Sequence, residues 1–436
     1  MTTPAVATTT DSTSVSPPDT RSRYYVLGLL TVVYSCNFID RQLLSILQES
    51  VKKEMLLSDG QLGLLTGFAF AMFYVLAGLP IARWADRGNR RDIVAGSLVV
   101  WSLMTALCGM AQNYWQLLAA RIGVGIGEAG GSPPSHSMIS DIFPPEQRAT
   151  ALSFYSVGIN IGILFGFLLG GYLNEVFGWR IAFLVVGLPG ILLGIIVRYT
   201  MAEPTRGLYS VGTYVHKPVP FFEVVSLLLS RRAFRHIAIG SGLAAFVGYA
   251  ASTWMASFMI RSHGMATGEL GVWLALTIGV GGGIGTFCAG MFADKLAKTD
   301  KRWYAWLPAC AGLAGLPFFA WTMLAENPYL ALTVHVGSVL VANAYLGASI
   351  AVMHGMVGAQ MRAVSSAIFF LVLNIIGLGL GPWTVGIYSD YLFAEFGKES
   401  LRYSLLTIIP IVGVWASAHF FLAARTLRGD LAAAPA

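Results

Sequence analysis

The stretch EQRATALSFYSVGINIG, residues 146–162, occurs a second time in the chain in altered form. Its counterpart is AQMRAVSSAIFFLVLNIIG, residues 359–377, in which Arg362 aligns with Arg148. These two arginines are 214 residues apart, which is close to half the length of the chain. Each copy begins with polar residues and continues into an apolar run, a pattern typical of a helix that enters a membrane. The repeat therefore predicts a chain built from two similar halves.

Apolar stretches long enough to cross a bilayer fill most of the chain. The hydrocarbon core is about 30 Å thick and a helix rises about 1.5 Å per residue, so roughly 20 apolar residues make one span. Such stretches lie at 24–47, 62–83, 92–111, 114–138, 149–173, 180–199, 236–260, 269–292, 303–325, 329–352, 363–389 and 403–424. A hydrophobic fraction of 56 % and a charged fraction of 11 % exclude an ordinary soluble domain. We predict an all-α membrane protein with twelve transmembrane helices, arranged as two pseudo-symmetric six-helix bundles.

The predicted spans divide the chain into five segments. The first is rich in Thr, Ser and Pro and lacks the apolar core of a signal peptide, so we expect a disordered tail. The linker between the bundles contains a stretch, residues 221–234, with the pattern of an amphipathic helix that lies on the membrane surface. The segments are the tail 1–20, the first bundle 21–200, the linker 201–235, the second bundle 236–425 and the C-terminal tail 426–436.

The basic residues predict the orientation in the membrane. Of the 28 Lys and Arg residues, twenty lie in segments on the side of the termini and six on the opposite side. The other two, Arg41 and Arg121, lie inside spans. Because cytoplasmic loops carry the excess of Lys and Arg, we expect both termini in the cytoplasm, with the chain in a bacterial inner membrane. The net charge of +6 is scattered over many loops, so a nucleic-acid partner is not expected.

Four charged residues lie inside two of the predicted spans: Asp40 and Arg41 in the first, Arg121 and Glu128 in the fourth. An unpaired charge inside a membrane costs about 2.5 to 3.5 kcal/mol, so pairing is expected. Asp40 and Arg121 lie at similar depth, and Arg121 and Glu128 are seven residues apart on one helix face. A salt bridge that only locks the helices together is one interpretation. We favour a second, in which Asp40 and Glu128 take up and release a proton while Arg41 and Arg121 are their exchangeable partners.

The second half has no counterpart to these charges. Its spans 236–260 and 329–352 contain no Asp, Glu, Lys or Arg in their central parts. A charged wall that faces an apolar wall suits a ligand with a polar head and an apolar tail. The predicted substrate-binding residues are Asp40, Arg41 and Glu128 from the first half, and Phe246, Tyr249, Trp254, Met255, Asn343 and Met353 from the second. Packing between helices or contact with lipid is the competing interpretation for each residue of the second wall.

Two motifs resemble those of a known transporter family. ARWADRGNRR, residues 82–91, resembles the GxxxDRxGRR motif of the major facilitator superfamily, although two of its glycines are replaced. RIGVGIGEAG, residues 121–130, resembles the RxxxGxG element of the same superfamily. Within it, NFIDRQ at 37–42 and GIGEAGGSPP at 125–134 are similar to the Spinster family. The resemblance implies the major facilitator fold, secondary active transport and, for Spinster, export of lysolipids and sphingosine phosphate.

The loop motif returns in the second half as GMFADKLAKTDKR, residues 290–302, with Asp294 in place of Asp86. The resemblance implies a cytoplasmic gate in which Asp86 accepts hydrogen bonds from a helix N-terminus or a facing Arg in the outward-open state. The predicted gate residues are Asp86, Arg87, Arg90, Arg91, Arg148, Asp294 and Arg362. Ordinary positive-inside charge is the competing interpretation.

Together these features predict a proton-coupled secondary active transporter that exports a lysolipid or sphingoid-type lipid by alternating access. A proton-coupled symporter that imports small organic anions is the alternative, because such proteins also carry an Asp-Arg pair in the first span and an Arg and a Glu in the fourth. A lipid sensor without transport activity is a remote third. We expect no enzyme activity, no metal and no cofactor, because neither a catalytic cluster nor paired cysteine spacing is present. The expected partners are protons, an amphiphilic lipid and the bilayer, and we expect a monomer.

Overall fold

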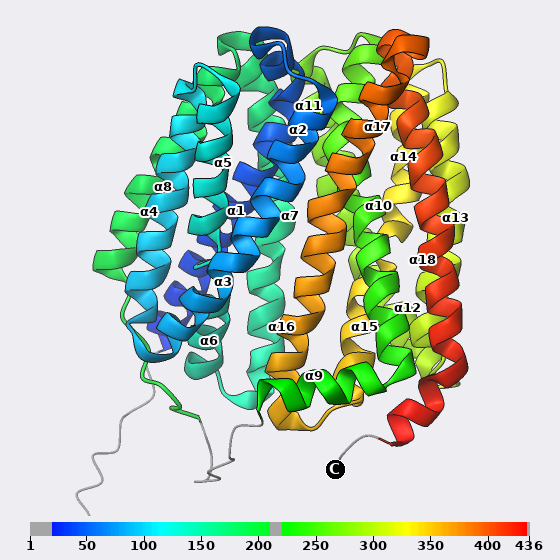
Figure 1. The fold of residues 1–436 in the computed structure, drawn as a ribbon. Helices are drawn as coiled ribbons and strands as arrows, with labels where there is room; N and C mark the ends of the chain where they lie inside the picture. Colours follow the sequence, from blue (N-terminus) through cyan, green and yellow to red (C-terminus); the bar gives the residue numbers. More distant parts are fainter. Residues whose placement is uncertain (1–19, 210–219, 434–436) are drawn as a thin grey trace, which may run out of the picture.

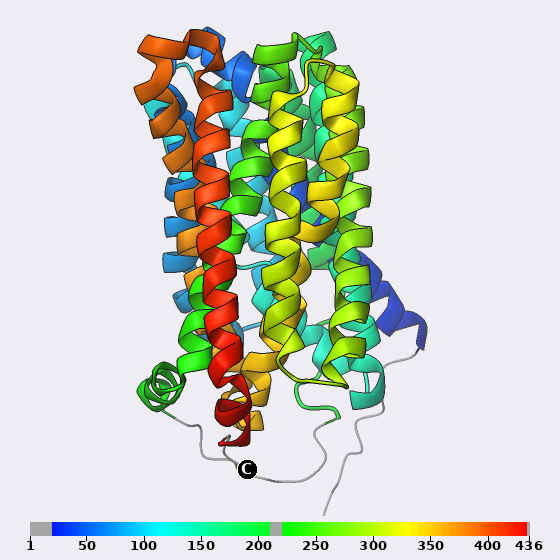
Figure 2. The same cartoon turned by 90° about the vertical axis from the view of Figure 1, so that its right-hand side faces the viewer.

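The computed structural model describes residues 20–209 and 220–433, which form a bundle of long helices (Figure 1). The predicted disordered tail up to residue 19, and residues 210–219 of the predicted linker, lie outside the described residues. The described part of the chain begins at Thr20 and ends at Ala433, and both lie at the same end of the bundle, the lower one in Figures 1 and 2. We call this the termini end and the opposite one the far end. The predicted all-α fold with twelve spans is confirmed.

Nine α-helices and one π-helical turn make up the first half and the segment that follows it, and the rest of the chain repeats the plan. The first-half elements are α1 (Thr20–Met55), α2 (Asp59–Gly63), η1 (Leu64–Phe68), α3 (Ala69–Arg87), α4 (Arg90–Met110), α5 (Tyr114–Glu128), α6 (Ser132–Ile142), α7 (Pro145–Phe177) and α8 (Trp179–Thr200), and α9 (Phe221–Ser230) follows them. The second-half elements are α10 (Arg232–His263), α11 (Thr267–Leu274), η2 (Ala275–Val280), α12 (Gly281–Ala297), α13 (Trp303–Leu324), α14 (Pro328–Ala342), α15 (Ala344–Gly355), η3 (Ala359–Met361), α16 (Arg362–Leu373), η4 (Asn374–Leu380), α17 (Gly381–Phe396), η5 (Gly397–Glu399) and α18 (Ser400–Ala432). The last helix extends well beyond its predicted end at residue 424.

Two kinds of helix interruption follow the internal repeat, whereas η4 in span eleven has no counterpart in the continuous α7 of span five. Spans two and eight each contain a π-helical turn, η1 and η2, and spans four and ten each break near their middle. The fourth span was expected to be continuous over residues 114–138, but α5 ends at Glu128. Prolines occupy the first turn of α6, where the missing N–H groups fit a new helix start and would disrupt a continuing one. The break places Glu128 at a helix terminus inside the bundle.

Nine helical segments in the described part of the chain are long and apolar enough to cross a membrane by length and composition. The number is lower than twelve partly because α16, η4, α17 and α18 are joined into one segment, Val364–Ala432. In addition, α5 is only 15 residues long, and α1 is made less apolar by Asp40 and Arg41. The two spans that carry the buried charges are therefore the ones that composition alone identifies least well.

The buried core shows how the two halves meet. At the far end one cluster contains residues of both halves, such as Leu47 of α1 and Trp254 of α10. Toward the termini end a second cluster belongs almost entirely to the first half, around Trp101. A third cluster belongs to the second half, around Phe420. The halves therefore share a core at the far end and have separate cores toward the termini end.

Candidate functional site

Arg41 and Glu128 form a buried ion pair near the middle of the first half. Nε of Arg41 on α1 lies 2.7 Å from Oε2 of Glu128, the last residue of α5. The Glu128 side chain is fully buried, and that of Arg41 is 14 % exposed. Removing either partner would leave an uncompensated buried charge, which typically costs about 3 to 5 kcal/mol. The pair thus joins spans one and four directly.

Aromatic rings surround the Arg41 guanidinium. Its Cζ lies 5.1 Å from the ring centroids of Phe38, Phe70 and Tyr74. Phe70 also lies 5.4 Å from Cζ of Arg121, so one ring contacts both guanidinium groups. Cations at such distances are attracted by the negative face of the ring. The charged residues are thus held among aromatic side chains, in surroundings with few competing dipoles.

Asp40 and Arg121, which we expected to pair, form no ion pair within 4.0 Å in this conformation. Both residues are buried, at 3 % and 2 % exposure. Nε and Nη1 of Arg121 have no hydrogen-bond partner among the described residues, and neither does Oε1 of Glu128. Buried groups of this kind normally find a partner, and leaving one without costs about 1 to 3 kcal/mol or more for a charge. The site therefore has unused capacity to bind a proton or a polar ligand group.

The predicted apolar wall is only partly assembled around these charges. Tyr249 of α10 packs against the first-half core that contains Phe70, the ring that lies against Arg41. Phe246, Trp254 and Met255 are instead packed in the shared far-end core. The indole Nε1 of Trp254 donates to the carbonyl of a neighbouring helix. The structure therefore brings Tyr249 to the charged residues and places these three among the packing residues.

The two remaining residues of the predicted wall, Asn343 and Met353, differ in how deeply they are buried. Met353 is 1 % exposed and packs in the core of the second half. Asn343 is exposed and lies at the break between α14 and α15, the counterpart of the break after Glu128. In this conformation a polar amide, and not an apolar side chain, marks the equivalent position of the second half.

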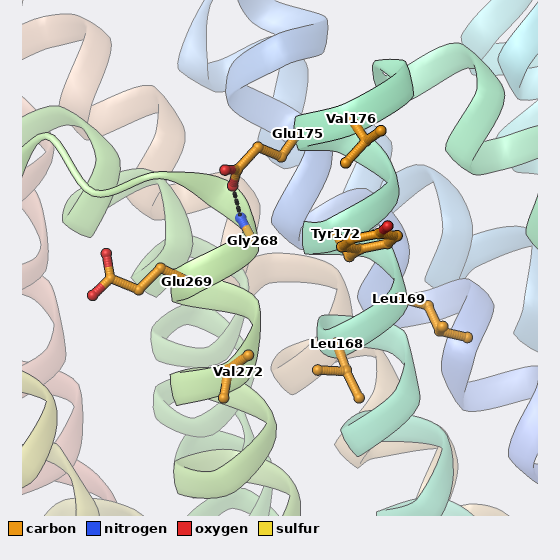
Figure 3. Close-up of a pocket in the computed structure, with 8 residues that line it drawn as sticks. All are labelled: Leu168, Leu169, Tyr172, Glu175, Val176, Gly268, Glu269 and Val272. Carbon is orange, nitrogen blue, oxygen red and sulfur yellow. Dashed lines mark hydrogen bonds between the residues drawn. The ribbon is translucent and has the colours of Figure 1, made fainter.

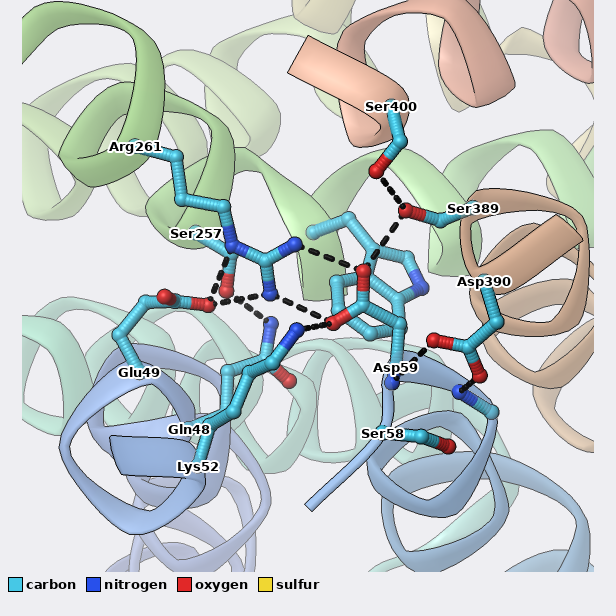
Figure 4. A network of polar contacts seen from close by, with 12 residues as sticks. Gln48, Glu49, Lys52, Ser58, Asp59, Ser257, Arg261, Ser389, Asp390 and Ser400 are labelled. Atoms are coloured by element: carbon cyan, nitrogen blue, oxygen red, sulfur yellow. Dashed lines mark hydrogen bonds and ion pairs between the residues drawn. The ribbon is translucent and has the colours of Figure 1, made fainter. Parts of the chain in front are cut away.

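A second cluster of buried charges joins the halves at the far end (Figure 4). Arg261 of α10 donates from Nη2 to Oε1 of Glu49 at 2.6 Å and to Oδ1 of Asp59 at 2.7 Å. Nη1 of Arg261 lies 2.7 Å from the other oxygen of Asp59. Asp59 is 1 % exposed and also accepts hydrogen bonds from Lys52 and from Ser389. One arginine of the second half therefore bridges two carboxylates of the first, and Lys52 supplies the second positive charge.

The same region contains a helix cap that crosses between the halves. The carboxylate of Asp390 on α17 accepts from the backbone N of Asp59 at 2.8 Å and of Gly60 at 2.7 Å, at the start of α2. A carboxylate at a helix N-terminus satisfies free N–H groups and complements the helix dipole. We call Glu49, Lys52, Asp59, Arg261, Ser389 and Asp390 the far-end network. Its contacts hold α1 and α2 against α10 and α17.

Sequence reasoning missed the far-end network. Lys52 and Arg261 were counted only for the orientation, and Glu49, Asp59 and Asp390 were not considered. A usable signal was present, because the far side holds few basic residues and several of them flank acidic ones at span ends. The partners from opposite halves are 202 to 331 residues apart in the chain, so their pairing is visible only after folding.

The predicted gate residues at the termini end do not bridge the halves in this conformation. Arg90 is 1 % exposed and binds Asp141 and Glu203, which lie in the first half and the linker. Asp294 accepts a hydrogen bond from Tyr304 of its own half. Asp86 is exposed. In this conformation the motif at residues 82–91 therefore binds the start of the linker through Arg90.

The other predicted gate residues also bond locally or are exposed. Arg91 donates to Asp92 and to the carbonyl of Met201. Nε of Arg148 donates to the carbonyl of Phe143 at 3.1 Å. Arg87 and Arg362 are exposed. These residues leave the termini end without the kind of network that joins the halves at the far end.

A pocket of about 350 Å³ is lined by none of the four charged residues of spans one and four (Figure 3). It is a groove between α7 of the first half and α11 of the second, near the far end. Its lining is mostly apolar and includes the exposed side chains of Tyr172 and Val272. Glu175 spans the two helices by accepting a hydrogen bond from the backbone N of Gly268 at 2.6 Å. The groove therefore opens toward the bilayer at a junction of the halves.

Comparison with known proteins places the chain in context. The model of the Major Facilitator Superfamily matches residues 30–382. An MFS-type efflux pump of Mycolicibacterium smegmatis is 32 % identical over 431 residues, which cover 99 % of each chain. Protein spinster homolog 3 of Danio rerio is 25 % identical over 452 residues, covering 98 % of this chain and 89 % of that protein.

A solved structure shares both fold and arrangement. It is the crystal structure of a bacterial homolog to the human lysosomal transporter Spinster, in an inward-facing and unoccupied conformation. It is 33 % identical to this chain, with a TM-score of 0.86, and the match covers 94 % of this chain and 99 % of that one. The resemblance to Spinster expected from the sequence is thereby confirmed.

Proposed function

The chain belongs to the Major Facilitator Superfamily, and we propose that it is a proton-coupled exporter of a lysolipid or sphingoid-type lipid that works by alternating access. As a member of this superfamily it is an integral membrane transporter for a small-molecule substrate and not an enzyme. The observation that carries the proposal is the buried Arg41–Glu128 pair beside Asp40 and Arg121, which do not pair.

Proton coupling follows from competition for the two arginines. When Glu128 is ionised, Arg41 neutralises it, and the pair is stable in its buried position. When Glu128 takes up a proton, Arg41 is released to bind an anionic group of the substrate, such as a phosphate. Rocking of the halves then exposes the protonated carboxyl to the other side. Each carboxyl thereby exchanges a proton with one side at a time.

The lipid class is supported by the surroundings of the charges. The second half contributes Tyr249 and an uncharged surface, which suits an acyl chain better than it suits a small polyanion. The bilayer-facing groove between α7 and α11 offers an apolar path at the junction of the halves. The similar efflux pump of M. smegmatis supports an outward direction of transport.

The orientation and state belong to the same proposal. The termini end carries most of the Lys and Arg residues, so it faces the cytoplasm of a bacterial inner membrane. The shared core and the far-end network then close the outer side, and the separate cores lie on the inner side. This arrangement corresponds to an inward-facing state, as in the similar bacterial structure.

The test is uptake into proteoliposomes with and without a pH gradient. A radiolabelled lysolipid is expected to move with the gradient, and Glu128→Gln is expected to abolish gradient-driven transport because the amide keeps the size and loses the titration. Lys298→Gln, an exposed loop change, is the matched control and should retain activity. Undiminished gradient-driven flux in Glu128→Gln would contradict the coupling role. Transport of short organic acids and not of lysolipids would favour the symporter alternative.

A further inference from the structure

The helix α9 lies crosswise to the spans at the termini end (Figures 1 and 2). One face of it is buried against the second half, since Val224 and Leu228 pack in the same core cluster as Phe369 of α16. These two residues are four apart, which places them on one side of a helix. Val225 and Leu227 are half-buried, and the other six residues of α9 are exposed in the described part of the chain, including large apolar side chains.

The exposed surface of α9 divides into an apolar and a polar strip. Phe221, Phe222 and Leu229 are 50 %, 82 % and 54 % exposed. At 100° per residue they fall on one strip next to the buried face. Glu223, Ser226 and Ser230 fall on the opposite strip. A helix with a buried, an apolar and a polar strip fits the corner where protein, hydrocarbon and water meet.

Two arginines without an ion pair in the described part of the chain follow α9 directly. Arg232 and Arg235 begin α10, directly after α9, and both are exposed. They share a helix face with Ile239, which is 36 % exposed, so this face points toward the bilayer. Neither forms an ion pair within the described part of the chain. A long arginine side chain just before the span reaches the level of the lipid phosphates.

The other charged groups near α9 and the start of α10 are either engaged or distant. Arg231 donates to the carbonyl of Ala433. Asp430 accepts from the backbone N of Ala233 at 2.7 Å and so caps α10. Glu223 lies eight residues before Arg231, about 12 Å along the helix. The charges of Arg232 and Arg235 are therefore free to attract an anion from the membrane.

We propose that Arg232 and Arg235, together with the apolar strip of α9, bind an anionic phospholipid in the leaflet at the termini end. The two guanidinium groups hold the phosphate of the headgroup, and Phe222 and Leu229 rest on its acyl chains. Because α9 packs on α16, the bound lipid fixes α16 relative to the membrane surface. This site is separate from the transport pathway and does not depend on the identity of the substrate.

The proposal is tested by native mass spectrometry of the full-length protein with phosphatidylglycerol and with phosphatidylcholine. Each basic residue near a membrane surface contributes about fivefold to anionic-lipid binding, so Arg232→Gln with Arg235→Gln is expected to weaken phosphatidylglycerol binding about 25-fold. Phosphatidylcholine binding should not change. Arg232→Lys with Arg235→Lys should retain most of the affinity because the charges remain.

The matched control is Lys298→Gln with Lys301→Gln, which removes two exposed charges from the same end of the molecule. It is expected to change phosphatidylglycerol binding less than twofold. Equal losses in the control and test variants would overturn the proposal, because binding would then reflect diffuse charge. Equal affinity of the wild-type protein for the two lipids would overturn it as well. Thermal unfolding of each variant in detergent checks that the fold is retained.

Discussion

The two ends of the molecule use their charged residues differently. At the far end Arg261 and Asp390 of the second half bind Glu49, Asp59 and the start of α2 in the first. At the termini end Arg90 and Asp300 bind partners in their own half or in the linker. In the far-end network the polar contacts therefore resist separation of the halves, and the corresponding contacts at the other end do not. The difference identifies which end must lose contacts, and which must gain them, when the transporter changes state.

Removing Arg261 is expected to cause the largest shift from a closed to an open far end. Arg261→Ala leaves Glu49 and Asp59 buried with only Lys52 nearby, at a cost of about 3 to 5 kcal/mol in the closed far end alone. The population with an open far end should rise more than a hundredfold. Distances between spin labels at Leu56 and Glu326, in a chain without its native cysteines, report the opening. Arg402→Ala removes an arginine that pairs within its own half and should leave the distances unchanged.

A change at the termini end should shift the equilibrium in the opposite direction. Asp86 is exposed here, so Asp86→Asn is expected to affect only the outward-open state, in which the proposed gate forms. Loss of a charged hydrogen bond is worth about 1 to 3 kcal/mol and should favour the inward-open state. Labels at Glu146 and Lys298 should then show a larger share of long distances. If the distance distribution of Asp86→Asn equals that of the wild type at every pH, Asp86 does not act in a gate and contributes only to the orientation of the chain in the membrane.

The cap of α2 should have a smaller effect than Arg261. Asp390→Asn keeps an acceptor for one N–H group and loses the charge that complements the helix dipole. We expect a loss of about 1 kcal/mol and a roughly fivefold shift toward an open far end. The same pair of labels measures it, and Glu395→Gln, at the end of the same helix, is the control. A shift as large as that of Arg261→Ala would show that the cap dominates the network.

The smallest expected effect concerns Asp300, in the loop before α13. Hydrogen bonds from Arg302 and Arg428 lower the pKa of Asp300 to about 2. A carboxyl with a lowered pKa stabilises the fold above its ordinary pKa, and this contribution is lost only as the pH falls toward 2. The small difference in melting temperature between the wild type and Asp300→Asn should thus be the same at pH 7 and pH 4. A difference that disappears by pH 5 would contradict this ion pair.

The sequence predicted the parts of the fold that depend on local composition. Apolar length gave the twelve spans, and the repeat around Arg148 and Arg362 gave the two halves. The four buried charges were also found, because a charge in an apolar run stands out. Their pairing was predicted less well, since Arg41 binds Glu128 while Asp40 and Arg121 remain apart. Which charges meet depends on how the helices are rotated, and the sequence does not report rotation.

The far-end network and the apolar wall were beyond sequence reasoning for a related reason. Asp390 and the start of α2 are more than 300 residues apart, and a cap supplied by another span has no local signature. Trp254 was assigned to the substrate wall because it lies near the position of the second half that matches Arg41 in the repeat. Its side chain faces the packed core instead. Depth can be counted from span ends, but the direction of a side chain is set by neighbouring helices.

Where η1 meets η4, the two halves approach each other through glycine. A Cβ on Gly67 would lie only 2.8 Å from the carbonyl of Gly379, and one on Gly63 would lie 2.6 Å from that of Pro382. Backbone lies directly against backbone here, beside a contact between the rings of Phe68 and Trp383, whose centroids are 5.0 Å apart. When the halves turn, this aromatic contact and the charge contacts around Arg261 must both be broken. Because these charges are buried, salt screens them little, and the turnover rate should respond only weakly to the ionic strength of the solution at the far end.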